Sequence, residues 1–267
     1  MLKQRILTAL VLFLLALSAL FFAEEWVWEL LVMLLGAVAA WEWAGFSRWT
    51  GKMQRGFFTV FTLLLSFLTL NVFVQEDLWL LGLLGVSIAV LVVMRYQLTC
   101  GRFGLRTDIG ILLSGVLMLL VFTNVLVFFR NDFSPTILLI SMASVWAMDT
   151  GAFFAGKRFG RHKLAQHVSP GKTWEGVLGG AIASFIFSWL ALGALFSGSD
   201  YSSLLPAVML ALIAVVSVFG DLFESVLKRQ VSLKDSGRIL PGHGGVLDRV
   251  DSLLIALPLS YLMWSLA

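Results

Sequence analysis

The sequence is poor in cysteine, proline and charge. Its single cysteine, Cys100, excludes an intrachain disulfide and cannot by itself form a thiolate metal site. No proline-rich linker, internal repeat or low-complexity segment divides the chain, so residues 1–267 are predicted to form one integral-membrane domain. Only 13% of the residues are charged and 59% are hydrophobic, which excludes the soluble classes and indicates a protein with several membrane spans.

Nine apolar runs are long enough to cross a bilayer as helices. The fold class is therefore all-α, a polytopic transmembrane helical bundle. The first run follows a short basic stretch, as in a signal peptide, but it is long and no small-residue cleavage site follows it, so we expect it to be retained. The runs lie, to within several residues, at 6–23, 26–46, 57–74, 78–94, 108–129, 135–155, 177–196, 203–227 and 250–266.

The positive charges predict the orientation of the bundle. With the N terminus in the cytoplasm, 18 of the 19 Lys and Arg residues fall on the cytoplasmic side, and only Arg130 lies opposite. The two longest polar loops, 156–176 and 228–249, then face the cytoplasm, where nucleotides and divalent cations are abundant. Topology therefore explains the net charge of +3, and no nucleic-acid partner is expected.

Charged residues gather on one face at the end of the eighth run. The spacing i, i+3, i+4, i+7 relates Asp221, Glu224, Ser225 and Lys228. An ion pair that ends the span is one explanation of this pattern. Because a charge inside a span costs about 2.5 to 3.5 kcal/mol, a bound cation such as Mg²⁺ is the other explanation for Asp221.

A glycine-rich segment, 241–245, precedes two aspartates at the start of the ninth run. Helix capping explains Asp248 and Asp251, because negative charge suits a helix N terminus. The alternative is a cradle for phosphate and Mg²⁺, in which backbone amides near Gly244 and Gly245 approach the ligand closely.

Basic residues surround these aspartates. Taken one at a time, each is explained by the preference of Lys and Arg for the cytoplasmic side of the membrane. As a group they carry more positive charge than membrane orientation requires. This favours phosphate binding, because arginine suits bidentate contacts to phosphate. His243 is expected either to serve phosphate or proton chemistry or to make a structural hydrogen bond. The basic residues are Lys228, Arg229, Lys234, Arg238 and Arg249.

The other polar loop contains Ser169-Pro-Gly-Lys-Thr-Trp-Glu-Gly176. It is not a P-loop, because the upstream glycine is missing at the required spacing and no strand is expected before it. Ser169, Lys172 and Thr173 are predicted phosphate contacts. Glu175 is predicted to bind a metal or to orient Lys172.

Three further carboxylates lie inside apolar runs. Asp149 interrupts the sixth run, where we expect it to cap a helix or to bind the metal. Glu29 and Glu42, in the second run, are expected to pair within the bundle or to face a cavity, without a specific role.

No Ser-His-Asp or Cys-His pattern is present. Phosphoryl and nucleotidyl transfer need none, because a phosphomonoester is already ionised near neutral pH and catalysis rests on positioning and charge neutralisation. The two polar loops and the carboxylates at the membrane edge therefore predict Mg²⁺-assisted chemistry between a soluble nucleotide and a lipid phosphate.

The segment 225–251 resembles the signature of the phosphatidate cytidylyltransferases, also called CDP-diacylglycerol synthases: S-x-hydrophobic-K-R, four residues, K-D, then H-G-G-hydrophobic-x-D-R-hydrophobic-D. Segments 149–152 and 169–176 also resemble this family. Residues 1–130 match only as generic apolar helices, so 131–267 is expected to be the catalytic half.

The resemblance implies transfer of CMP from CTP to phosphatidate, giving CDP-diacylglycerol and pyrophosphate for phospholipid biosynthesis. It also implies Mg²⁺ as cofactor, with the number of cations left open, a homodimer, and a bacterial inner membrane location with the site facing the cytoplasm. Expected catalytic residues are Asp221, Lys228, Arg229, His243 and Asp248. Expected substrate contacts are Ser169, Lys172, Thr173, Ser225, Lys234, Gly244, Gly245 and Arg249. Expected metal ligands are Asp221 and Asp248, followed by Asp251 and Asp149.

Two other functions use the same residues. A transporter or flippase of phosphorylated lipid needs a charged passage and an outward gate, which the one-sided distribution of basic residues does not favour. A CTP-dependent lipid kinase transfers the γ-phosphate and releases CDP. The identity of the product separates the three functions.

Overall fold

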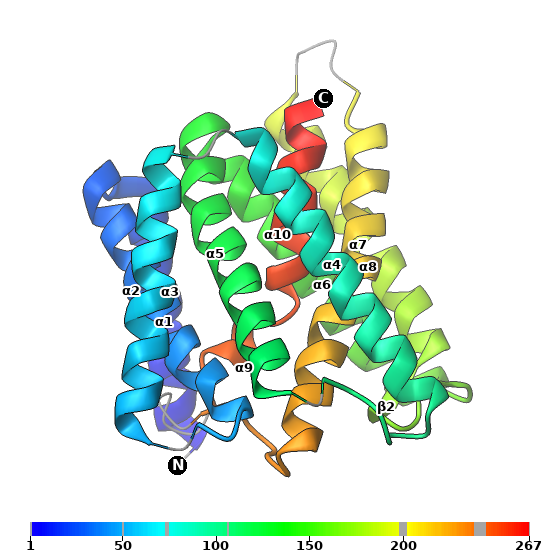
Figure 1. Cartoon of the computed structure of the whole chain (residues 1–267). Coiled ribbons are helices and arrows are strands. Elements are labelled where there is room, and N and C mark those ends of the chain that lie inside the picture. Colours follow the sequence, from blue (N-terminus) through cyan, green and yellow to red (C-terminus); the bar gives the residue numbers. More distant parts are fainter. Residues whose placement is uncertain are drawn as a thin grey trace.

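The protein is a bundle of long helices that run roughly side by side (Figure 1). The structure is a computed structural model that describes residues 2–49, 51–72, 75–105, 107–197, 202–237 and 244–266. The long helices are α1 (Leu2–Phe22), α2 (Glu25–Trp43), α3 (Lys52–Val72), α4 (Gln75–Leu98), α5 (Asp108–Asp132), α6 (Pro135–Phe159), α7 (Trp174–Leu195) and α8 (Leu204–Gln230). The shorter ones are a 3-10 turn, η1 (Ala44–Phe46), then α9 (Leu247–Val250) and α10 (Leu253–Leu266).

Each of the first eight predicted spans coincides with one of the long helices, and the predicted helical bundle is confirmed. Within the described residues, seven helices, α2 to α8, are long and apolar enough to cross a membrane. The protein is therefore a multi-pass membrane protein. The ninth predicted span differs most, because it is divided into α9 and a buried α10 of only 14 residues.

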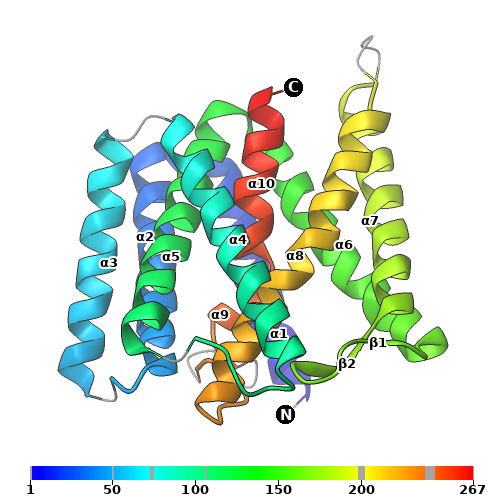
Figure 2. The same cartoon turned by 45° about the vertical axis from the view of Figure 1, so that its right-hand side comes forward.

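The helix α5 lies at the centre of the bundle, against α2, α3, α4 and α10. Nearly all its side chains from Ile111 to Phe129 are buried, as expected of a helix that is apolar on every side. The helix α3 lies at one edge (Figure 2) and exposes Phe57, Phe61 and Phe67. Such an apolar outer surface suits contact with lipid.

The helices α6 and α7 form the closest pair, on the side of the bundle away from α3 (Figure 2). Glycines allow this approach, because a Cβ atom on Gly180 would lie only 2.6 Å from the Met148 carbonyl oxygen. The pair carries the hairpin that follows α6.

One end of the bundle collects the α2–α3, α4–α5, α6–α7 and α8–α9 connections (Figures 1 and 2), and we call it the basic end. The predicted cytoplasmic loops 156–176 and 228–249 both lie there. Arg130 lies at the opposite end, where its guanidinium donates to the carbonyl oxygens of Leu20 and Ala23. Its exceptional position is thus explained by capping of the last turn of α1.

Two local predictions are wrong. Asp149 neither interrupts nor caps a helix, because α6 continues unbroken to Phe159. No strand was expected before the Gly-Lys-Thr sequence, yet Ser169–Thr173 forms β2, which pairs antiparallel with β1 (Lys163–Ala165). The missing upstream glycine still distinguishes this segment from a P-loop.

Candidate active site

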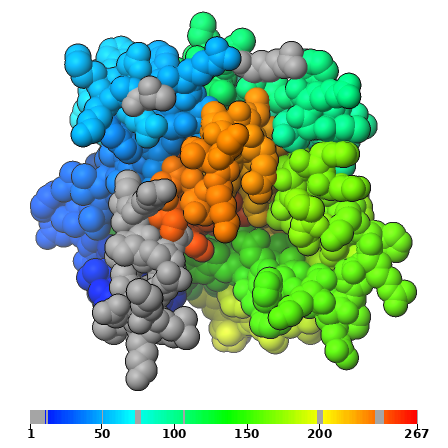
Figure 3. Space-filling model, turned by 90° about the horizontal axis from the view of Figure 1, so that it is seen from below, coloured from blue at the N-terminus to red at the C-terminus, as the bar shows by residue number. Residues whose placement is uncertain are grey.

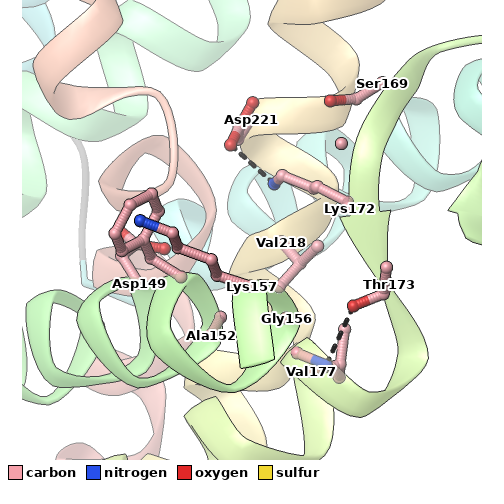
Figure 4. A pocket seen from close by; sticks show the side chains of 13 residues that line it. Asp149, Ala152, Gly156, Lys157, Ser169, Lys172, Thr173, Val177, Val218 and Asp221 are labelled. Atoms are coloured by element: carbon pink, nitrogen blue, oxygen red, sulfur yellow. Dashed lines mark hydrogen bonds and ion pairs between the residues drawn. The ribbon is translucent and has the colours of Figure 1, made fainter. Parts of the chain in front are cut away.

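A pocket of about 490 Å³ lies between α6, β2, the start of α7 and α8 (Figure 4). Five predicted site residues line it, although they come from three separate segments of the chain: Asp149, Ser169, Lys172, Thr173 and Asp221. The remaining lining residues are Ala152, Phe153, Gly156, Lys157, Gly171, Gly176, Val177 and Val218. The pocket therefore has both charged and apolar walls.

An ion pair joins the hairpin to α8 inside this pocket. The Lys172 ammonium lies 2.5 Å from Asp221 Oδ2, and both side chains are partly buried (Figure 4). Ser225 Oγ donates to Asp221 Oδ1 at 3.3 Å, from one turn further along α8. Lys172, a predicted phosphate contact, and Asp221, the first predicted metal ligand, are thus direct partners. The ammonium group compensates the negative charge of Asp221 near the end of its membrane span.

Two side chains at the start of α7 fix the hairpin. Thr173 Oγ1 accepts the Gly176 N–H at 3.1 Å, so Thr173 caps the helix as well as lining the pocket. Glu175 accepts the backbone N–H groups of Arg161 and His162, and its Oε1 lies 2.6 Å from His162 Nδ1. The Glu175 carboxylate thus anchors the residues before β1. The prediction that it orients Lys172 is wrong, because Lys172 pairs with Asp221, and the alternative that it binds a metal stays a prediction.

A second charged cluster lies where α8 meets α9. The Lys228 ammonium donates to Glu224 Oε2 at 2.9 Å and to Asp248 Oδ1 at 2.7 Å. Glu224 is only 1% exposed. Lys228 therefore bridges two carboxylates from different helices.

Backbone groups of the 228–249 loop also hold Asp248. Its Oδ2 accepts the N–H of Ser236 at 3.0 Å and that of Gly245 at 2.8 Å. Burial alone would raise the pKa of Asp248, but the hydrogen bond from Lys228 and those from the backbone outweigh it and lower the pKa below its usual value. Asp248 is thus kept ionised, but it does not cap α9, because the N-cap residue is Val246 and the Gly245 N–H that Asp248 accepts lies before the helix.

The turn between α9 and α10 contacts α8 at a glycine. A Cβ atom on Gly220 would overlap the carbonyl oxygen of Asp251, so only glycine permits this approach. Asp251 Oδ1 accepts the Ser252 N–H at 2.7 Å, and its charge and that of the neighbouring Asp221 interact. Figure 3 shows the end of α8 and the residues after it at the centre of the basic end.

The carboxylates of these two clusters fit a hard cation in their chemistry, because Mg²⁺ prefers oxygen ligands. Glu224 Oε1 is buried and accepts no hydrogen bond from a donor in the described part of the chain, so an acceptor beside these carboxylates is open to a cation. Among the residues that the structure describes, however, no three Asp, Glu, His or Cys side chains converge as ready metal ligands. Lysine ammonium groups pair with Asp221 and Asp248 instead.

Comparison of the amino-acid sequence with known proteins shows which family the chain belongs to. A family model described as "Cytidylyltransferase family" matches residues 3–267. The chain belongs to the cytidylyltransferase family. The motifs had suggested a similarity confined to the half after residue 130. The family match also includes the N-terminal helices, so the similarity extends over the whole chain.

Several bacterial members are similar in sequence. A phosphatidate cytidylyltransferase of Pseudomonas aeruginosa is 41% identical over 271 residues, covering 99% of this chain and 98% of that protein. One of Haemophilus influenzae is 36% identical over 282 residues, covering 97% and 96%. One of Thermotoga maritima is 40% identical over 141 residues, covering 51% of this chain and 52% of that protein.

The other predicted residues that the structure describes in this member of the cytidylyltransferase family lie outside the pocket lining. Arg229, Lys234 and Arg249 are exposed near the second charged cluster. Gly244 has a φ of +84°, a conformation that favours glycine and explains the residue without a ligand. The predictions for Arg238 and His243 fall outside the described residues.

Glu42 also contributes to this site, which its position in the sequence did not reveal. This side chain on α2 is 2% exposed, and its Oε2 accepts the Leu247 N–H at 2.9 Å and the Ser236 hydroxyl at 3.2 Å. Ser236 is also a donor to Asp248, so Glu42 ties the N-terminal helices to the loop that holds Asp248. In the sequence, Glu42 stands out only as a carboxylate within an apolar run, and this does not reveal that it binds Ser236 and Leu247.

Lys157 was also missed. It lines the pocket from α6, two helical turns after Asp149, whereas its place in a basic loop predicted only the orientation of the bundle. The spacing of Asp149, Phe153 and Lys157 at i, i+4 and i+8 was the available signal.

Proposed function

We propose that the protein is a phosphatidate cytidylyltransferase of the bacterial inner membrane, with its site facing the cytoplasm. It transfers CMP from CTP to phosphatidate and releases pyrophosphate. The observation that carries this proposal is the pocket at the basic end, where Asp149, Lys172 and Asp221 lie beside the apolar side chains of Val177 and Val218. Such a pocket suits a substrate with a charged head group and apolar chains. Its volume of about 490 Å³ is typical of a small-molecule site.

The reaction needs charge neutralisation more than acid–base chemistry. An ionised oxygen of phosphatidate attacks the α-phosphorus of CTP, and a new P–O–P bond forms. The bond between the α-phosphorus and the oxygen that bridges it to the β-phosphorus breaks, and pyrophosphate leaves with the electron pair. Since the attacking phosphate is already ionised, no general base is required.

The lysines of the site supply positive charge where phosphates must meet. Lys172 on β2 and Lys228 on α8 are both held by carboxylates, which orients their ammonium groups before substrate binds. Preorganised cations of this kind stabilise a charged transition state without reorganisation. Ser169, which also lines the pocket, is a neutral hydrogen-bonding group for a phosphate oxygen.

Mg²⁺ is part of the proposal. Asp221 and Asp248 would hold it, with Asp251 and Asp149 next to them, and the bound ion would neutralise phosphate charge and stabilise the leaving pyrophosphate. The support is the oxygen-rich character of the cluster and the unsatisfied Glu224 Oε1. The homodimer implied by the family resemblance is likewise a proposal, and the mass of the detergent-solubilised protein measures it.

Product analysis tests the function. Purified protein is incubated with CTP, phosphatidate and Mg²⁺, and lipid and nucleotide products are separated. We expect CDP-diacylglycerol and pyrophosphate in equal amounts, and no turnover after chelation of Mg²⁺. Release of CDP without CDP-lipid would instead indicate a lipid kinase, and the absence of any nucleotide turnover would favour a transporter.

A further inference from the structure

The helix α6 presents a fourth charged side chain, Lys157, to the pocket besides the three predicted ones. Asp149 and Lys157 both line the pocket (Figure 4). Phe153 lies between them on the same face of the helix and lines it as well. The Lys157 ammonium lies 5.9 Å from the centroid of the Phe153 ring. This is within the range of a cation–π contact, which holds the ammonium over the ring.

Lys157 differs from the other lysines of the site in its electrostatic partners. Lys172 is paired with Asp221, and Lys228 with two carboxylates. Within the described part of the chain, no carboxylate lies within 4 Å of the Lys157 ammonium. Its side chain is exposed, so its charge is available to an anion that enters the pocket.

The surroundings of Lys157 favour the lipid substrate over the nucleotide as that anion. Large aromatic side chains are exposed around the end of α6 and the start of α7, with Phe153 62%, Phe154 65%, Phe159 66% and Trp174 59% exposed. Exposed aromatic rings and lysines with long apolar stems gather where the hydrocarbon of a bilayer meets water. Lys172, by contrast, lies on the hairpin and contacts α8.

We propose that Lys157, held over the Phe153 ring, binds the phosphate of the lipid substrate, whose acyl chains pass the exposed phenylalanines of α6 into the bilayer. This inference rests on the proposed function, because it assigns the lipid within the same site. The triphosphate of CTP offers the same charge chemistry, so the experiment must separate the two substrates.

Steady-state kinetics of Lys157→Gln separate them. Loss of a charge-assisted contact to phosphate is expected to raise the KM for phosphatidate, measured as its mole fraction in mixed micelles, about tenfold, because such hydrogen bonds are stronger than neutral ones. The KM for CTP should stay within about twofold, since the proposal assigns Lys157 to the lipid phosphate and not to the nucleotide. Lys157→Arg, which keeps the charge, should restore most of the lipid affinity.

Arg158→Gln is the matched control. It removes the same charge from the adjacent position at the same helix end, but Arg158 does not line the pocket. Its KM for phosphatidate should equal that of the unmodified protein. An unchanged KM for the lipid in Lys157→Gln, an equal rise in Arg158→Gln, or a rise confined to CTP would each overturn the proposal.

A binding measurement keeps this inference distinct from the proposed function. Short-chain phosphatidate should raise the Tm of the unmodified protein in detergent, because a ligand that binds the folded state stabilises it. The same lipid should give a clearly smaller rise with Lys157→Gln and an undiminished rise with Arg158→Gln. If the unmodified protein makes no CDP-lipid, the proposed function fails, whereas equal Tm shifts for all three proteins contradict the role of Lys157.

Discussion

Replacement of Lys228 by methionine is expected to destabilise the protein as well as to inactivate it. The Lys228 ammonium lies 2.9 Å from Glu224 and 2.7 Å from Asp248, and the three side chains are 13%, 1% and 12% exposed. Methionine retains the length of the chain but leaves two carboxylates without their cation. Breaking a buried pair in this way costs about 3 to 5 kcal/mol, because the charge that remains is uncompensated.

The assay is thermal unfolding of the purified protein in detergent. For a chain of this size, about 1 kcal/mol corresponds to roughly 2 to 4 °C in Tm, so a fall of at least about 6 °C is expected. Arg229→Met is the control, because it removes a charge from the next, exposed position of α8. Exposed charges of this kind contribute little to stability, and the Tm should change by no more than about 2 °C.

A double substitution tests the origin of the loss. Glu224→Gln removes one of the two negative charges, so adding it to Lys228→Met should recover part of the lost stability. An unchanged Tm in Lys228→Met, with activity lost, would refute the reasoning and assign Lys228 to substrate binding alone. No recovery in the double variant would show that lost packing, rather than the uncompensated carboxylate, dominates.

Three further substitutions test other parts of the site. Asp221→Asn should lower Mg²⁺-dependent formation of CDP-lipid by about 100-fold or more while the protein stays folded, and an active variant would remove Asp221 from the catalytic machinery. Gly220→Ala should cost about 1 to 3 kcal/mol in thermal unfolding, because its Cβ overlaps the α9–α10 turn, whereas Gly193→Ala, whose Cβ has ordinary contacts, should not destabilise. Glu42→Ala should cost about 1 to 3 kcal/mol, because it leaves Ser236 and a backbone N–H without their acceptor. Faster hydrogen exchange of the 228–249 loop would show this local loss, and unchanged exchange would contradict the tethering role of Glu42.

The sequence predicted the spans and the arrangement of the connections well. Crossing a bilayer requires a run of apolar residues of defined length, so the number and approximate bounds of the helices follow from composition along the chain. Lysine and arginine resist translocation, so their positions predicted that loops 156–176 and 228–249 lie at one end. These two physical demands act on each segment separately, which is why local reasoning sufficed.

The partners of individual side chains were decided by tertiary structure. Asp149, Lys172 and Asp221 meet in one pocket only because α6, β2 and α8 pack around it. Hydropathy defines which segments cross the membrane but not which faces of the helices meet, so the sequence did not reveal the anchoring role of Glu175 or the tether from Glu42.

For the chemistry of the site too, part follows from the sequence and part from the tertiary structure. By itself the sequence determined a membrane bundle with phosphate-binding residues in two loops on one side, because each residue type and its place in a loop carry that information. Only the tertiary structure decided that Lys228, one turn from Glu224 on α8, also meets Asp248 of α9, and that Lys157 of α6 shares a pocket with Lys172 and Asp221. Both arrangements depend on distances between helices that are far apart in the sequence, and these are set by packing.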